Sequence, residues 1–495
     1  MEFSYWKNHN FLNLSTAAVA GVLIAVAVIF LEPIMVLVLT GAILGASVLV
    51  FYPEYGFIAI LILLSSILGE EQVPTIDIGL QIYIADIIFA FLVVIMIIRL
   101  LVDPDFHLEK TPFAIPLFIF WGLALLTTVI HIFDNSIVIG DGIQEMRIIS
   151  YYLLLIPFVQ LIRTKKQLNR LLNVMFILAT LTAAANILQY ILGDTITFLT
   201  GRVEQFSDGV TRITDNPGEG IITTTFIVLT IRLFLSNFKF NNIFHFLQWL
   251  IIGGAMLISF NRTHWGVAGL SLLITFFLTN PEQRSKIMSW GLSILWLIPL
   301  AILPALFFRD SAYSALVDAA VGRFQTLFTS QSYVDPTEST IIWRNFEYHY
   351  GLPQIASNPV LGLGMGALYR PFIPQIDGWG NMGPHYTHNG HLWIAMKAGL
   401  LSWFALLSFM GMFIANGFKK WKRVKDPEMQ SLALGFTLVA VSVLFGSILH
   451  PMIITFFWTP LLGVIFAINH VIFRLYLDND NEKLPVVPNP EPFIE

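Results

Sequence analysis

Apolar segments long enough to cross a lipid bilayer recur along nearly the whole chain, from Leu14 to Arg474. A segment inside hydrocarbon can satisfy its own backbone hydrogen bonds only as a helix. Of the 495 residues, 56% are hydrophobic and 12% are charged, and the mean hydropathy is +0.74. Soluble domains carry about 25% charged residues, so this chain has too few charges to cover a water-soluble globule. The sequence therefore predicts an all-α polytopic membrane protein.

The breaks between the apolar segments predict the number of membrane-spanning helices. The expected spans are residues 14–31, 33–51, 55–68, 80–101, 112–133, 147–162, 171–192, 221–235, 245–260, 266–278, 289–308, 391–414, 431–449 and 453–473. Two early segments can instead form one broken or re-entrant helix, so we expect about 12–14 spans. This divides the chain into residues 1–308 with eleven helices, a large outer loop over 309–390 with short helices, three helices over 391–475, and a disordered tail over 476–495.

The basic residues predict the orientation of these helices. Lysine and arginine cluster at 163–170 and at 419–425, and six predicted spans separate the two clusters. An even number of spans places both loops on one side, and short basic loops are cytoplasmic. With this orientation most of the 27 lysine and arginine residues face the cytoplasm, and both termini are cytoplasmic.

The cations that remain on the outer side are all arginine, and the other exception, Lys397, falls within a helix. They are Arg147, Arg202, Arg212, Arg262, Arg309, Arg323, Arg344 and Arg370. Guanidinium binds phosphate oxygens in a bidentate manner and keeps its charge when partly buried. The alternative is that these side chains reach toward lipid headgroups. The arginine-only set favours a phosphate-binding outer surface.

Three outer segments carry most of these arginines. Residues 200–220 are expected to form a loop in which Arg212 precedes a helix that starts at Asn216-Pro217, which predicts either an anion site or an ordinary polar turn. Residues 261–265 are too short for more than a tight hairpin, which places Arg262 at its tip and His264 at the membrane interface.

The third segment, 309–390, is the only sizeable soluble part that the sequence predicts. Apolar spacing predicts an amphipathic helix over 314–328 on the membrane surface and a second helix over 340–356. The glycine run 362–366 follows no predicted strand, so we interpret it as a turn and not as a nucleotide-binding loop.

Three histidines, His385, His388 and His391, end this segment at intervals of three residues. A zinc site is one interpretation, but the chain has no cysteine and few acids lie nearby. A general base is favoured because the pKa of histidine lies near working pH. A hydrogen-bonded loop histidine is the structural alternative for each of them. We therefore predict no metal and no cofactor.

The order of these motifs resembles the O-antigen ligase and polymerase superfamily of bacterial envelope enzymes. The chain reads SFNRTHWG at 259–266, then Trp343-Arg344, then NPVLGLGMG at 358–366 and HNGHLWIAMKAGL at 388–400. The similarity covers about residues 147–401 and is most specific in the last two motifs. It implies a bacterial inner-membrane protein with a periplasmic active site and a glycan donor linked to undecaprenyl diphosphate.

The resemblance also assigns roles to residues. It implies that His388, followed by Asn389, is essential, and it matches the family's arginines to Arg262 and Arg212. We expect His388 to act as the base while Arg147, Arg212, Arg262 and Arg344 hold the diphosphate. Supporting roles are expected for Asn389, Asn216, Trp343, His385, His391 and Lys397. Two departures are that Lys397 stands where the family has an acidic residue, and that Arg344 follows its tryptophan.

The implied reaction moves a glycan from undecaprenyl diphosphate to an acceptor hydroxyl, with inversion and without metal. The acceptor is a lipid A core sugar or a growing polysaccharide, so ligase and polymerase both remain open. The partners are the lipid-linked donor, the acceptor and membrane lipids, with no nucleic acid. A secondary transporter is the main alternative from another class, although only Asp86 and Lys397 stand out as charges within spans. A non-catalytic assembly scaffold is a further alternative.

Overall fold

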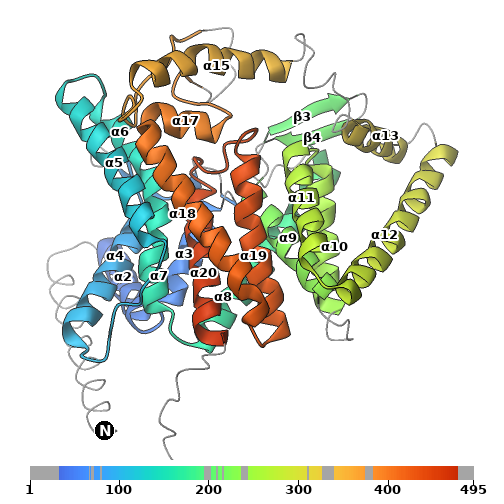
Figure 1. The fold of residues 1–495 in the computed structure, drawn as a ribbon, viewed down its shortest axis with the longest axis horizontal. Helices are drawn as coiled ribbons and strands as arrows, with labels where there is room; N and C mark the ends of the chain where they lie inside the picture. The colour runs from blue at the N-terminus through green and yellow to red at the C-terminus, as the bar shows by residue number, and fades with distance from the viewer. Residues whose placement is uncertain are drawn as a thin grey trace, which may run out of the picture.

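The computed structural model describes residues 33–65, 67–68, 72–77, 81–193, 202–207, 210–214, 217–235, 243–308, 312–325, 339–373 and 383–477. Nearly all of this part is helical (Figure 1). The helices are α2 (Pro33–Phe51), α3 (Glu54–Leu64), α4 (Ile84–Val102), α5 (Ala114–Phe133), α6 (Ile139–Ser150), η2 (Tyr151–Leu154), α7 (Leu155–Leu161), α8 (Lys165–Leu192), α9 (Glu219–Leu235), α10 (Ile243–Ile258), α11 (Arg262–Leu278), α12 (Pro281–Phe307), α13 (Ala312–Gln325), α15 (Ser339–Ser357), α17 (Gly390–Lys397), α18 (Gly399–Lys420), η5 (Trp421–Arg423), α19 (Pro427–Gly446) and α20 (Thr459–Tyr476).

The chain is a multi-pass membrane protein, as the apolar segments predict. Within the described residues six helical stretches are long and apolar enough to cross a bilayer: α4, α5, α8, Gly399–Arg423, α19 and α20. Residues Ile43–Phe51 and Glu54–Leu64 together would make a seventh, bent by 119°. Helices α9, α10 and α11 have 17, 16 and 17 residues. The total of 12–14 spans stays a prediction.

Several helix bounds agree with the sequence because local signals define them. Helix α2 has the predicted limits, and α15 extends the predicted 340–356 by one residue at each end. Helix α19 instead begins four residues before the predicted 431, after Asp426, whose carboxylate accepts a hydrogen bond from the N–H of Met429, with Pro427 at the first helical position. Helix α13 covers most of the predicted helix 314–328 and starts two residues earlier, and residues 326–328 lie outside the described residues.

Three sequence expectations about helices were wrong. The span 391–414 is two helices, because Gly399 has φ of +82° and a Cβ there would lie 2.2 Å from the carbonyl oxygen of Val360. The span 147–162 belongs to a longer helical stretch that starts at Ile139 and includes the 3₁₀ turn η2. The last span starts at Thr459 and not at residue 453, because residues 447–458 form a non-helical connection, the 447–458 loop.

Residues 200–220 were also predicted wrongly, since they contain a hairpin and not only a loop. Strands β3 (Arg202–Ser207) and β4 (Val210–Thr214) pair antiparallel, with Glu204 opposite Arg212. The sequence contains signals for this hairpin that the prediction overlooked. Asp208-Gly209 is typical of a two-residue hairpin turn, and β4 is rich in β-branched residues. A second short hairpin, β1 (Thr75–Asp77) and β2 (Gln81–Tyr83), precedes α4.

The two basic clusters lie at one end of the helix bundle. The ammonium of Lys165 lies 4.3 Å from the ring centre of Tyr476, and Val424 forms a β-bridge with Leu477. Helices α15 and α17 lie at the opposite end (Figure 1). This agrees with the expectation that the two basic loops share one side.

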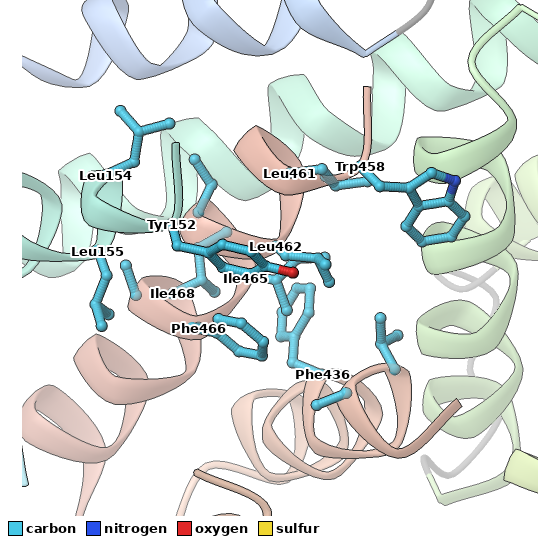
Figure 2. Close-up of a cluster of buried hydrophobic side chains, with 14 of the residues drawn as sticks. Tyr152, Leu154, Leu155, Phe436, Trp458, Leu461, Leu462, Ile465, Phe466 and Ile468 are labelled. Atoms are coloured by element: carbon cyan, nitrogen blue, oxygen red, sulfur yellow. The ribbon is translucent and has the colours of Figure 1, made fainter. Parts of the chain in front are cut away.

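The core is an apolar cluster built on η2, α19 and α20 (Figure 2). The rings of Tyr152 and Phe466 are stacked with centroids 6.3 Å apart, and Trp458 is 1% exposed. The hydroxyl of Tyr152 donates to the carbonyl oxygen of Ile453 at 3.0 Å. The core therefore fixes the 447–458 loop, which the candidate site contacts.

Candidate active site

His388 is paired with a buried glutamate that lies 41 residues earlier in the chain. Its ring Nδ1 is 2.6 Å from Oε1 of Glu347, and its backbone N–H donates to both Glu347 oxygens at 3.0 and 2.9 Å. Glu347 is 2% exposed, whereas a quarter of the His388 side chain is accessible. With Nδ1–H directed at the carboxylate, the other ring nitrogen, Nε2, is the one that accepts a proton.

The start of α17 holds His388 in place. Asn389 caps this helix through its side-chain oxygen, which accepts from the N–H groups of His391 and Leu392. Its amide nitrogen donates to the hydroxyl of Tyr348 at 2.8 Å. The ring of Trp343 meets the His388 ring edge-on, with centroids 6.2 Å apart. Helices α15 and α17 thus fix the imidazole from both sides.

The other two histidines of the motif have different partners. His385 lies 3.6 Å from Glu145, and burial lowers its pKa, assisted by the charge of Lys397 and opposed by Glu145. The Nε2 of His391 lies 2.8 Å from the carbonyl oxygen of Leu444, and the Trp403 indole donates to its Nδ1 at 3.2 Å. The three side chains therefore do not converge on one point.

Lys397 is fully buried and forms an ion pair with Glu145 of α6. The second oxygen of Glu145 accepts a hydrogen bond from the N–H of Gly366 at 2.6 Å. The N–H of Gly364 donates to the carbonyl oxygen of Lys397 at 2.8 Å. The glycine run is a turn, as predicted, and these contacts attach it to α6 and α17.

Arg344 lies one turn before Glu347 on α15 and reaches the 447–458 loop. Its Nη2 donates to the carbonyl oxygen of Leu449 at 3.3 Å. The N–H of Gly390, two residues after His388, donates to the carbonyl oxygen of Ser447 in the same loop at 2.9 Å. Arg344 and His388 therefore border one region of the molecule.

Arg262 is the first residue of α11, and α10 ends only four residues before it, so the tight hairpin is confirmed. Phe260 takes a positive φ of 51°, and its carbonyl oxygen accepts from Nε of Arg323 at 3.1 Å. His264 is 2% exposed and was wrongly expected at the interface. Its ring lies 5.4 Å from that of His450, the residue after Leu449, so the hairpin meets the same loop as Arg344.

Arg212 lies on β4, opposite Glu204, and α9 begins seven residues later at Glu219. The helix start that the sequence predicts after Arg212 is therefore present. Asn216 lies outside the described residues. Strand β4 packs against α8 and α13.

Arg147 is engaged with protein groups on another face of the site. Its Nε lies 3.1 Å from a carboxylate oxygen of Asp86, and its guanidinium carbon is 4.6 Å from the ring centre of Tyr83. It also donates to the carbonyl oxygen of Gln81. The pair borders a groove of about 510 Å³ whose walls are mainly apolar side chains of α5 and α6, among them Leu125, Ile139 and Met146.

The comparison with known families concerns the half of the site that contains His388. Residues 247–407 match the family model described as O-antigen ligase. This part of the chain is similar to the O-antigen ligase family. This confirms the superfamily that the motifs resemble. The match includes Arg262, Trp343, Arg344, His388 and Lys397, whereas Arg147 and Arg212 precede it. No curated protein matches the chain.

Sequence reasoning missed Glu347 as the partner of His388. The available signal was its position, three residues after Arg344 on a predicted helix, which places both side chains on one face. It also missed Glu219 and His450, which approach each other only through the tertiary fold.

Proposed function

We propose that this chain is a membrane glycosyltransferase that moves a glycan from undecaprenyl diphosphate to an acceptor hydroxyl. The observation that carries the proposal is the His388–Glu347 pair beside Arg344, inside the part of the chain that is similar to the O-antigen ligase family. We further propose that the protein lies in the bacterial inner membrane and that this end of the bundle faces the periplasm. Residues 309–390 would form most of the periplasmic part.

His388 acts in this proposal as the general base. The acceptor hydroxyl loses its proton to Nε2 of His388 while its oxygen forms a bond to the anomeric carbon. The bond from that carbon to the diphosphate oxygen breaks on the opposite face, so the anomeric configuration inverts. Glu347 orients the ring and stabilises the imidazolium that forms, as a carboxylate does in other histidine-dependent sites.

The arginines stabilise the departing undecaprenyl diphosphate. Its negative charge grows as the glycosidic bond breaks, and preorganised guanidinium groups lower the energy of that state. Arg262 and Arg344 are the main ligands in this proposal. Arg344 contacts the 447–458 loop directly, and Arg262 begins the helix whose His264 lies beside His450 of that loop. Arg212 joins them from β4. Arg147 would have to share its guanidinium between the donor and Asp86.

Release of undecaprenyl diphosphate from a lipid-linked oligosaccharide tests the proposal. The purified chain should release it and form a longer or lipid-attached glycan in the presence of a chelator. His388→Ala should lower the rate by about 10²–10⁴-fold, the usual contribution of a general base. His349→Ala is the matched control, since His349 is an exposed histidine on the same helix as Glu347.

Equal rates for the His388→Ala and His349→Ala chains would refute the role of His388. The size of the product decides between two acceptors within the proposal. A single transfer to a lipid A core sugar identifies a ligase, and a ladder of repeats identifies a polymerase. Uptake of substrate into proteoliposomes without any covalent product would favour a transporter instead.

A further inference from the structure

We propose that Glu219, His264 and His450 form a binding site for a divalent transition-metal ion of the zinc class. The three residues come from the first residue of α9, the first turn of α11 and the 447–458 loop. This site is distinct from the three histidines at 385–391, whose side chains have separate partners. The proposal does not depend on the transfer reaction.

The ligand atoms are already gathered around one point. Nε2 of His450 lies 2.9 Å from Oε1 of Glu219, and Nε2 of His264 lies 3.9 Å from Oε2 of Glu219. One ligand atom from each residue lies within 4.8 Å of the other two. In a tetrahedral zinc site with bonds of about 2.0–2.2 Å the ligand atoms are about 3.3–3.6 Å apart. Small side-chain rotations would close the set around an ion.

The buried histidine supplies the second observation. His264 is 2% exposed, and among the described residues its Nε2 has no hydrogen-bond partner, although this nitrogen lies 3.9 Å from a carboxylate oxygen of Glu219. An unsatisfied polar atom in such a position costs about 1–3 kcal/mol. A metal ion would satisfy that nitrogen and would also neutralise the carboxylate.

The donor set selects the class of ion. Two imidazole nitrogens and one carboxylate suit zinc and its neighbours, whereas calcium and magnesium prefer oxygen ligands only. The indole of Trp458 donates to Oε1 of Glu219 at 3.1 Å. A hydrogen bond to a metal-binding side chain orients that side chain and commonly increases metal affinity.

The ion would connect three segments that lie close to the proposed diphosphate ligands. His264 is two residues from Arg262, and His450 follows Leu449, which accepts the hydrogen bond from Arg344. The ion would therefore hold these segments together, and it takes no part in proton or glycan transfer. The transfer reaction proposed at His388 uses no metal and is tested separately from this ion site.

Metal content measures the site directly. The full chain is purified in detergent through a histidine-free affinity tag, stripped with a chelator, exposed to Zn²⁺ and desalted. We expect one Zn²⁺ per chain, and with Co²⁺ the visible absorption of a four-coordinate site. His264→Ala and Glu219→Gln should each lower the affinity at least 10-fold, whereas His349→Ala should leave it unchanged.

A second readout covers a variant that fails to fold. Zn²⁺ should raise the thermal unfolding temperature of the unmodified chain and of His349→Ala, and should not raise that of Glu219→Gln. The proposal is overturned if the unmodified chain retains no metal, or if the ligand variants and His349→Ala bind equally. In either case the three residues are only a hydrogen-bonded cluster. Release of undecaprenyl diphosphate tests the transfer proposal and metal retention tests the ion site, so either proposal can fail while the other stands.

Discussion

At the residue scale, two buried glutamates hold the side chains of the candidate site in position. Glu347 holds His388, and Glu145 holds Lys397 together with the N–H of Gly366. Both glutamates lie far from their partners in the sequence, and both sit where an unpaired charge would be costly. The first contact belongs to the proposed chemistry, and the second attaches the glycine turn to the helices around it.

Replacing Glu347 by glutamine tests whether Glu347 acts on His388 or binds the lipid-linked donor. Glu347→Gln keeps the size of the side chain but removes the charge that stabilises the imidazolium of His388. We expect kcat to fall by about 10²–10⁴-fold while KM for the lipid-linked donor changes little. Glu347→Asp should restore part of the rate. A normal kcat with a raised KM would instead show that Glu347 acts in donor binding.

The Lys397–Glu145 pair should show strong coupling in a double-mutant cycle. Lys397→Met leaves Glu145 without its buried cation and should destabilise the fold by about 3–5 kcal/mol. Adding Glu145→Gln removes the unpaired charge and keeps an acceptor for the N–H of Gly366, so most of the loss should be recovered. Denaturant unfolding in detergent measures both. Additive losses would mean that the pair is not coupled in the folded protein.

At the element scale, the glycine turn fits only because its residues have no side chain. Gly362, Gly364 and Gly366 have φ values of 75°, 85° and 88°. A Cβ on Gly366 would lie 2.5 Å from the backbone nitrogen of Gly142 on α6. The turn packs against α5, α6 and α17, so it positions α17, which begins two residues after His388.

Gly366→Ala tests this packing, and Gly322→Ala, at a glycine with open space around it, is the control. The left-handed φ costs about 1–2 kcal/mol and the overpacking about 1–3 kcal/mol, so we expect a loss of about 2–5 kcal/mol. A Cβ on Gly322 in α13 would meet nothing within 4 Å, and Gly322→Ala should be neutral or stabilising by up to about 1 kcal/mol. Equal unfolding midpoints for the two variants would contradict the packing argument.

The helices were more predictable from the sequence than the site was. Apolar spacing defines α2 and α15 to within one residue at each end, because this signal is local, whereas α19 lies three to four residues before the predicted 431–449. The break at Gly399 was missed because it depends on the carbonyl of Val360, which approaches from another segment. Histidine and arginine candidates followed from their motifs, but Glu347 and the Glu219–His450 contact required the tertiary arrangement.

At the scale of the whole molecule, the ends of the bundle differ in chemistry. One end gathers the two lysine-rich clusters, where Arg474 and Lys165 contact neighbouring chain segments. The other end carries α15, α17 and the 447–458 loop, with His388 and Arg344. Such a division matches the bias of basic loops toward the cytoplasm. It leads to a prediction about which end a reagent outside the cell can reach.

The absence of cysteine from all 495 residues makes that prediction easy to measure. Lys166→Cys at the start of α8 and Ser357→Cys at the end of α15 place single thiols at exposed positions of the two ends. In intact spheroplasts a membrane-impermeant maleimide should label the Ser357→Cys chain, and it should label Lys166→Cys only after the membrane is permeabilised. The reverse pattern would place His388 on the cytoplasmic side, where no flipped lipid-linked glycan is available, and would remove the basis of the transfer proposal.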